Sequence, residues 1–377
     1  MKEQDFARIS EHLNGISRRD FMKFCTVMAV GMGLPLEVAP RIAAAVTAPQ
    51  RPPVIWLSGS ACTGCTESLL RPSHPSLEHL ILDLISLDYN ETLNAGAGHQ
   101  AEAALQASIK KNAGKFILVV EGAIPMKDGG VYCMIGGKPF SEIVRATAAK
   151  AAAVIAIGSC ASWGGVAAAK PNPTGAIGAP EFLKGTTVVT IPGCPPNAYN
   201  FLSTVLHFLT FKKLPALDEK GRPKFAYGRL IHENCERRPH FDAGRFAIQF
   251  GDEGHRKGYC LYKIGCKGPV TFANCPAILF NEIGPGAWPV GTGHPCFGCT
   301  EEGVGFHIPL HTQADLKYIT PGAAYPHIVT ERGEGASMGA VALAAGVAGV
   351  ALGAGVAVAR NLGKSEQSEQ GSSSEGE

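Results

Sequence analysis

Four cysteines of this sequence follow closely on short apolar runs. The runs cover residues 54–57, 116–120, 154–157 and 188–191, and helix-like stretches lie between them at 99–111, 141–152 and 197–209. This alternation predicts an α/β fold with a doubly wound parallel sheet and helices on its faces. The carboxyl ends of such strands share one edge of the sheet. We therefore expect four thiols to converge at that edge: Cys62, Cys65, Cys160 and Cys194.

From about residue 212 the pattern changes. Glycine, proline, cysteine and histidine become dense, and clear periodicity fades after a charged junction at 214–224. A segment of this composition, about 225–335, cannot hold itself together by regular structure alone, so metal ligation is the natural substitute for a core. Its candidate ligands fall into two groups along the chain: His232, Cys235, Cys260 and Cys266, then Cys275, Cys296 and Cys299.

The donor chemistry leaves two kinds of metal site open. Four thiolates suit either an iron–sulfur cluster or a tetrahedral zinc ion, and a single Cys-x-x-Cys pair is also compatible with a redox disulfide. The chain has twelve cysteines, 45% hydrophobic and 18% charged residues, and a net charge of +2. That composition excludes a disordered protein, and the near-neutral charge gives no basic field for binding nucleic acid.

The start of the chain has the three regions of an export signal. Arg18 and Arg19 precede a moderately apolar run, and small residues follow at 43–48. The paired arginines are typical of twin-arginine export, so we predict a signal peptide over residues 1–48. Because that route carries proteins already folded, it predicts a metal or redox centre built in the reducing cytoplasm. The even number of cysteines would otherwise allow six disulfides in an exported protein.

The other end of the chain contains an uncharged run at 338–359. The run is long enough to cross about 30 Å of hydrocarbon, and we predict a C-terminal transmembrane helix there. The alternative is a buried helix of a soluble domain. Residues 360–377 begin with basic side chains, which favours a cytoplasmic C-terminus, and end in a polar tail that we predict to be disordered.

With these motifs in view, the sequence resembles the small, electron-transfer subunit of nickel–iron hydrogenases over essentially the whole chain. The family's proximal 4Fe–4S motifs are matched at 61–67, 158–165 and 192–197. The resemblance implies a flavodoxin-like first domain over 49–224. It also implies the standard, oxygen-sensitive type, because glycines, Gly64 and Gly165, stand where oxygen-tolerant members have two additional cysteines.

Two more sets of motifs match the family's iron–sulfur domain, which the resemblance places at 225–335. The distal 4Fe–4S site, which has one histidine ligand, is matched at 232–235, 258–260 and 265–269. The medial 3Fe–4S site is matched at 274–276 and 293–299, with Pro289 in the stretch where the family has proline in place of a fourth ligand.

The resemblance implies a ligand set for each of three clusters. The ligands are Cys62, Cys65, Cys160 and Cys194 for the proximal cluster, His232, Cys235, Cys260 and Cys266 for the distal cluster, and Cys275, Cys296 and Cys299 for the medial cluster. It implies that a nickel–iron centre in a partner large subunit oxidises H2. Electrons would then pass through the three clusters to a membrane cytochrome b or a quinone-linked acceptor, on the periplasmic side of the cell membrane. The chain itself would hold no catalytic residue of this hydrogenase.

Three other functions compete with this interpretation. They are the nickel-binding catalytic subunit, the cluster-bearing subunit of a respiratory NADH dehydrogenase, and a non-enzymatic zinc-binding interaction module. Against the first argue six further cysteines in ligand contexts, beyond the pairs Cys62/Cys65 and Cys296/Cys299, and the convergence at the strand ends. The second lacks the later cysteine-rich domain. Metal analysis separates the third from an iron–sulfur protein.

We assign no metal-binding or catalytic role to several other reactive or charged residues. Cys25 lies in the predicted signal, and Cys133 is expected to be a free buried thiol. Glu67 and Glu121 are interpreted as solvated or capping carboxylates. The pair Arg237–Arg238 is interpreted as a basic surface pair.

Overall fold

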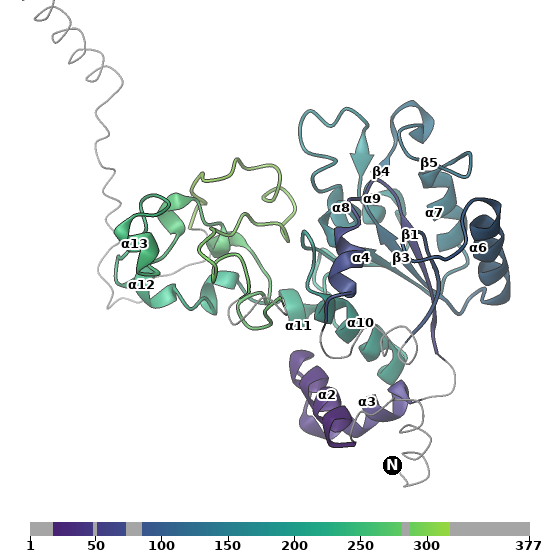
Figure 1. Cartoon of the computed structure of the whole chain (residues 1–377), viewed down its shortest axis with the longest axis horizontal. Helices are drawn as coiled ribbons and strands as arrows, with labels where there is room; N and C mark the ends of the chain where they lie inside the picture. The colour runs from purple at the N-terminus through teal and green to yellow at the C-terminus, as the bar shows by residue number, and fades with distance from the viewer. Residues whose placement is uncertain (1–17, 48–50, 73–84, 281–286, 317–377) are drawn as a thin grey trace, which may run out of the picture. The chain divides into compact units, whose positions relative to one another are not determined.

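A five-stranded parallel sheet organises the first domain (Figure 1). Its strands are β1 (Pro53–Ser58), β2 (Ser86–Asn90), β3 (Ile117–Glu121), β7 (Ala153–Ile157) and β9 (Val188–Ile191). They pair in the order β2-β1-β3-β7-β9, and every pairing is parallel. The predicted α/β fold with a parallel sheet is therefore confirmed, and the strand order is the one found in flavodoxin-like folds.

This computed structural model describes residues 18–47, 51–72, 85–280 and 287–316. All of them belong to one compact unit, Met1–Thr320.

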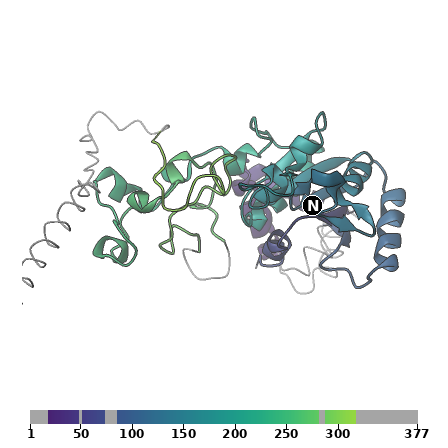
Figure 2. The same cartoon turned by 90° about the horizontal axis from the view of Figure 1, so that it is seen from above.

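Alternate side chains of β1 enter two separate hydrophobic cores. Val54 and Trp56 pack with α10 (Ala198–Phe211) on one face of the sheet. Ile55 and Leu57 pack on the other face with α6 (His99–Lys111) and α7 (Phe140–Ala148). Helix α6 lies at the outer side of the sheet in Figures 1 and 2. Because side chains alternate along a strand and both faces are covered, β1 appears in the sequence as a continuous apolar run.

Short elements connect these strands and helices. The helices are α4 (Gly64–Leu69), η3 (Lys127–Gly130), α8 (Gly158–Trp163) and α9 (Ala179–Phe182). Two antiparallel pairs are formed by β4 (Ile124–Pro125) with β8 (Ala176–Ile177), and by β5 (Met134–Ile135) with β6 (Lys138–Pro139). Both α4 and α8 begin close to the carboxyl ends of sheet strands.

The structure differs from the sequence predictions at two elements. Helix α7 ends at Ala148 rather than at 152, because the Ala152 N–H donates to the Phe116 carbonyl at 2.8 Å and the chain turns into β7. Strand β2 was not predicted, since its sequence contains Asp88. In the fold, the Asp88 carboxylate accepts hydrogen bonds from Ser108 Oγ at 2.6 Å and from Asn112 Nδ2 at 2.8 Å, both near the end of α6.

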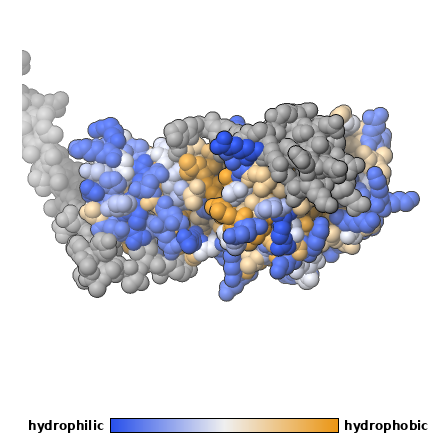
Figure 3. Space-filling model, turned by 90° about the horizontal axis from the view of Figure 1, so that it is seen from below, coloured by the Kyte–Doolittle hydropathy of each residue, from blue (hydrophilic) through white to orange (hydrophobic). Residues whose placement is uncertain are grey.

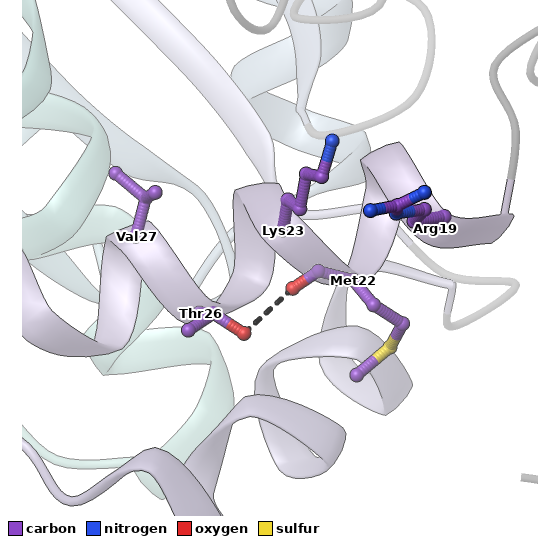
Figure 4. Close-up of a pocket in the computed structure, with 5 residues that line it drawn as sticks. All are labelled: Arg19, Met22, Lys23, Thr26 and Val27. Carbon is purple, nitrogen blue, oxygen red and sulfur yellow. Dashed lines mark hydrogen bonds between the residues drawn. The ribbon is translucent and has the colours of Figure 1, made fainter.

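The described part of the predicted signal forms α2 (Arg18–Gly31), η1 (Leu36–Val38) and α3 (Ala39–Val46). Phe21, Cys25, Met28 and Ile42 are buried in the same core as α10. One face of α2 lines a pocket (Figure 4). The lining residues follow the helical spacing and are Arg19, Met22, Lys23, Thr26 and Val27. Removal of this segment as a signal stays a prediction.

From Lys224 to the end of the described residues, the chain forms only short helices. They are α11 (Lys224–Tyr227), η4 (Ile231–Glu233), α12 (Arg238–Asp242), α13 (Glu253–Arg256), η5 (Tyr262–Ile264) and η6 (Gly268–Val270). Within the residues that the structure describes, no helix has the length and apolar character needed to cross a bilayer. The anchor predicted at 338–359 lies outside those residues.

Candidate metal centres

The four cysteines predicted for the proximal site lie beyond the carboxyl ends of three strands. Cys62 and Cys65 follow β1, Cys160 follows β7 within α8, and Cys194 follows β9. Burial raises the pKa of the Cys65 thiol well above its ordinary value, and the charges of Glu121 and of the other three cysteines raise it further. The other three cysteines therefore lie within electrostatic reach of Cys65 at this edge of the sheet.

Close backbone approach shapes this edge. A Cβ atom on Gly158 would lie 2.4 Å from Cys65 Sγ, and one on Gly165 would lie 2.8 Å from Cys160 Sγ. Both glycines have positive φ, 82° and 49°, which side chains other than glycine's rarely allow. Backbone hydrogen bonds from Val166 and Ala167 lower the pKa of the Cys160 thiol and partly offset its increase on burial. The edge therefore supplies thiols together with backbone donors for anionic sulfur.

Glu121 organises the first pair of thiols. Its side chain is 1% exposed, and its Oε1 accepts from the N–H groups of Cys65 at 3.1 Å and of Thr66 at 3.3 Å. Its Oε2 accepts from Trp56 Nε1 at 2.8 Å and from Thr66 Oγ1 at 2.6 Å. The capping interpretation of Glu121 is correct, and the solvated alternative is wrong.

The three cysteines predicted for the medial site are also brought together. Burial raises the pKa of the Cys299 thiol to about 12, with a further contribution from Cys275. Burial likewise raises the pKa of the Cys296 thiol, and the charges of Cys266 and Cys299 add to that increase. A backbone hydrogen bond from Cys194 reaches the Cys299 thiol. The medial set therefore lies between a proximal cysteine and a distal one.

The four residues predicted for the distal site line one cavity. Its walls also contain two arginines and several apolar groups, and the full lining is Ile231, His232, Cys235, Arg237, Arg238, Cys260, Leu261, Cys266, Gly268 and Val290. His232 Nε2 is buried and has no hydrogen-bond partner among the described residues. Burial, and then the charge of Arg238, lower the pKa of His232 to about 4. A neutral imidazole with a free ring nitrogen beside three thiols has the donor character of a metal ligand.

Two buried cations stand close to these ligands. Arg237 is 9% exposed and donates to the carbonyls of Val290 and Tyr259, each at 3.0 Å, so its assignment to a surface pair is wrong. Lys267 is fully buried, and its Nζ donates to the carbonyls of Gly265, Pro309 and Thr312 at 3.3, 3.1 and 3.4 Å. No carboxylate within the described ranges pairs with either side chain. Sequence reasoning missed both, because lysine and arginine are rarely expected inside a protein.

The candidate ligands are mostly thiols, and the two metal chemistries arrange thiols differently. All twelve cysteines are free thiols, which rules out the disulfide framework. In the described part of the chain, no three His, Cys, Asp or Glu side chains are close enough to bind one metal ion. A tetrahedral zinc ion draws four sulfurs to about 2.3 Å from one centre, whereas each thiolate on an iron–sulfur cluster binds a different iron. The two chemistries therefore place different demands on the spacing of the thiols.

Two family models match complementary parts of the chain. Residues 62–208 match the model described as NADH ubiquinone oxidoreductase, 20 Kd subunit. Residues 227–310 match the model for the C-terminal part of the NiFe/NiFeSe hydrogenase small subunit. The second match covers the cysteine-rich segment that distinguishes a hydrogenase small subunit from its respiratory counterpart, so the NADH dehydrogenase alternative is not favoured.

Relatives of known name cover nearly the whole chain. It is 54% identical over 362 residues to the Hydrogenase-2 small chain of Escherichia coli strain K12, covering 96% of this chain and 97% of that one. It is 53% identical over 288 residues to the periplasmic [NiFe] hydrogenase small subunit of Solidesulfovibrio fructosivorans. That alignment covers 76% of this chain and 90% of the relative. A structure of the [NiFeSe] hydrogenase of Dm. baculatum aligns with a TM-score of 0.62 and 35% identity, covering 67% of this chain and 95% of that one. This chain belongs to the family of nickel–iron hydrogenase small subunits, which carry iron–sulfur clusters and pair with a large subunit in a hydrogenase heterodimer.

Proposed function

We propose that this chain takes electrons released by H2 oxidation in the large subunit and passes them through three iron–sulfur clusters to an acceptor in the membrane. The proposed proximal 4Fe–4S ligands are the four thiols at the sheet edge, and the proposed medial 3Fe–4S ligands are Cys275, Cys296 and Cys299. The proposed distal 4Fe–4S ligands are His232, Cys235, Cys260 and Cys266. Clusters bound at these sites would supply one-electron redox chemistry.

The observation that carries the proposal is the buried, unpartnered Nε2 of His232. A buried polar nitrogen without a hydrogen-bond partner costs free energy. His232 lines the same cavity as Cys235, Cys260 and Cys266. Coordination of iron gives that nitrogen a partner. Its pKa of about 4 keeps the imidazole neutral near pH 7, so the distal set has one negative charge fewer than a set of four thiolates.

The order of transfer follows from the contacts between the three ligand sets. Cys194, in the proximal set, donates its backbone N–H to the Cys299 thiol. Cys296, in the medial set, donates its backbone N–H to Cys266 Sγ at 3.4 Å. The medial set therefore touches both others, which supports a path from proximal through medial to distal. In both contacts a backbone N–H of one set reaches a thiol of the next.

The sheet edge has the surface expected for the large subunit. Large apolar side chains there are exposed, with Met126 at 38%, Val131 at 55% and Val166 at 59%. Elsewhere on the surface, the face seen from below Figure 1 also has hydrophobic residues gathered between hydrophilic ones (Figure 3). Val166, whose backbone bonds to the Cys160 thiol, places one of these exposed apolar side chains beside the proximal set and supports docking of the catalytic subunit there. A cluster there would be the first to receive electrons.

The acceptor and the cellular location complete the proposal. We assign the chain to the periplasmic side of the cell membrane, exported by the twin-arginine route and anchored through 338–359. A membrane cytochrome b or a quinone-linked protein would collect the electrons. The names of similar proteins as periplasmic hydrogenase subunits support this location. Replacing Arg18 and Arg19 by lysines should leave the protein in the cytoplasm, and periplasmic recovery of that variant would contradict the assignment.

Metal analysis and electron paramagnetic resonance test the clusters directly. The purified heterodimer should contain about eleven irons in the small subunit, from two four-iron clusters and one three-iron cluster, in addition to the iron of the large subunit. The oxidised protein should give a three-iron signal. Zinc in place of iron, without visible absorption, would refute the proposal.

One substitution with a matched control tests the distal ligand. His232→Ala should remove the distal signal and leave the other two. His240→Ala is the control, because His240 Nδ1 is also buried without a described partner, but its ring packs on Tyr259 and does not line the cavity. Equal loss of the distal signal in both variants would contradict the ligand role of His232.

A further inference from the structure

A buried ion pair joins the segment after the sheet to the last pair of cysteines. Arg222 Nη1 lies 2.5 Å from Glu301 Oε1, and the two side chains are 6% and 7% exposed. The same Nη1 donates to the Thr300 carbonyl at 3.1 Å. Thr300 and Glu301 directly follow Cys299, so this guanidinium is fixed to the chain beside a proposed medial ligand.

Glu301 also bonds to the segment that precedes Cys275. Its Oε1 accepts the N–H of Phe272 at 2.9 Å, three residues before Cys275. Thr300 Oγ1 donates to the Phe272 carbonyl at 3.0 Å. One carboxylate and its neighbour therefore connect the chain next to Cys275 with the chain next to Cys299. These are two separate parts of the proposed medial ligand set.

Arg222 is in turn anchored to the first domain. Its Nε lies 2.7 Å from Asp218 Oδ2, and its backbone N–H donates to Asp218 Oδ1 at 2.8 Å. Thr190 of β9 holds this turn, since its N–H donates to the Gly221 carbonyl at 2.9 Å and its Oγ1 to the Lys220 carbonyl at 2.8 Å. The contacts run without a break from the sheet, through Arg222, to Glu301.

A second contact ties the same loop to the proximal site. Ser159 Oγ donates to the Cys299 carbonyl and accepts the N–H of Gly193 at 3.0 Å. Ser159 precedes Cys160, and Gly193 precedes Cys194. The loop that carries Cys299 is thus connected both to β9 and to the two segments that carry Cys160 and Cys194.

We propose that Arg222 and Glu301 are positioning residues that set the geometry of the medial ligand set relative to the sheet. The proposal rests on the medial assignment made above and goes beyond it, because neither residue is a ligand. Each residue of the pair has a second ion partner, Lys220 for Glu301 at 3.1 Å and Asp218 for Arg222 at 2.7 Å. A single substitution therefore leaves this four-residue network with a net charge, whereas the double substitution removes one charge of each sign. Single substitutions should therefore disturb both folding and the site, and a double substitution should separate the two effects.

The experiment compares Arg222→Met, Glu301→Gln, the double variant Arg222→Met/Glu301→Gln, and Arg222→Lys in the purified heterodimer. Each is measured by iron content, thermal unfolding and the resonance signals of all three clusters. Glu253→Gln is the control, because the Glu253–Lys257 pair is exposed in the same half of the chain. The single variants should lose most of the three-iron signal and keep the proximal signal. The double variant should recover only part of the lost thermal stability, because Lys220 and Asp218 lose their partners, and it should retain a shifted three-iron signal. Arg222→Lys should restore much of the wild-type spectrum.

Three outcomes would overturn the inference. The first is a wild-type three-iron signal in Arg222→Met or in the double variant. The second is a parallel loss of all three clusters in every variant, including Arg222→Lys, which indicates a purely structural role. The third is absence of the three-iron signal from the wild type, which refutes the medial assignment of the proposed function and this inference with it.

Discussion

Glu121→Gln is the change whose effect the structure defines best. The carboxylate of Glu121 accepts four hydrogen bonds, two on each oxygen, from the indole of Trp56 and from the Cys65–Thr66 turn. An amide offers only one accepting oxygen. In the better orientation its NH2 replaces Oε2, where the Thr66 hydroxyl can turn to accept but the Trp56 N–H loses its acceptor.

The free-energy cost follows from these contacts. A buried donor left unpaired costs about 1–3 kcal/mol, and each hydrogen bond that changes from charged to neutral loses about 1 kcal/mol. Relief of the desolvation of a buried carboxylate offsets part of that loss. We expect a net destabilisation of about 3 kcal/mol, which lowers the unfolding temperature of a domain of this size by about 6–12 °C.

Differential scanning calorimetry of the purified heterodimer measures this effect. Glu67→Gln is the matched control, because Glu67 is an exposed carboxylate on the same helix, α4, and should shift the unfolding temperature by no more than about 2 °C. A Glu121→Gln variant that unfolds with the control would refute the argument. It would mean that the buried carboxylate does not hold the Cys65 turn.

Three further predictions concern other parts of the chain. Burial raises the pKa of Glu91 from 4.5 to about 7, so the folded state binds the extra proton and stability should fall as pH rises through that interval; urea unfolding of Glu91→Gln should lack this pH dependence. Asn274→Ala breaks the reciprocal amide hydrogen bonds with Asn200, 2.8 and 3.1 Å long, beside Cys275. It should lower the free energy of unfolding, followed in urea by the three-iron signal, by about 1–3 kcal/mol. An unchanged free energy would contradict a role for that pair. Pro289→Cys supplies the missing thiolate and should replace the three-iron signal of the oxidised protein with a four-iron signal on reduction; a persistent three-iron signal would place Pro289 away from the medial site.

The strand–helix alternation was sufficient to predict the sheet and the gathering of four thiols at its edge. It worked because strands covered on both faces appear in the sequence as apolar runs. Strand β2 escaped because Asp88 interrupts such a run, and the side chains that accommodate it come from α6, later in the chain.

The burial and pairing of the charged residues that contact the cysteine-bearing segments could not be predicted in the same way. Arg222 and Glu301 are 79 residues apart, and nothing local marks either as buried. Glu121 ends a strand, where a solvated carboxylate is equally compatible with the pattern. The ligand-type residues were visible because cysteine is chemically distinctive, whereas their supports depend on pairings that only the fold creates.

The burial of Lys267 has a consequence for the order of assembly. Its ammonium lies inside the protein with carbonyl partners only, next to Cys266 and Cys296, and no carboxylate balances it among the described residues. Protonated thiols carry no charge, so a chain without clusters encloses an uncompensated cation, which is costly in a low dielectric. Thiolates of the proposed clusters would balance this charge, so we expect cluster insertion to be coupled to closure of this region. A chain without clusters should remain loosely folded here and sensitive to proteases. Protease sensitivity would therefore distinguish it from a chain that holds its clusters.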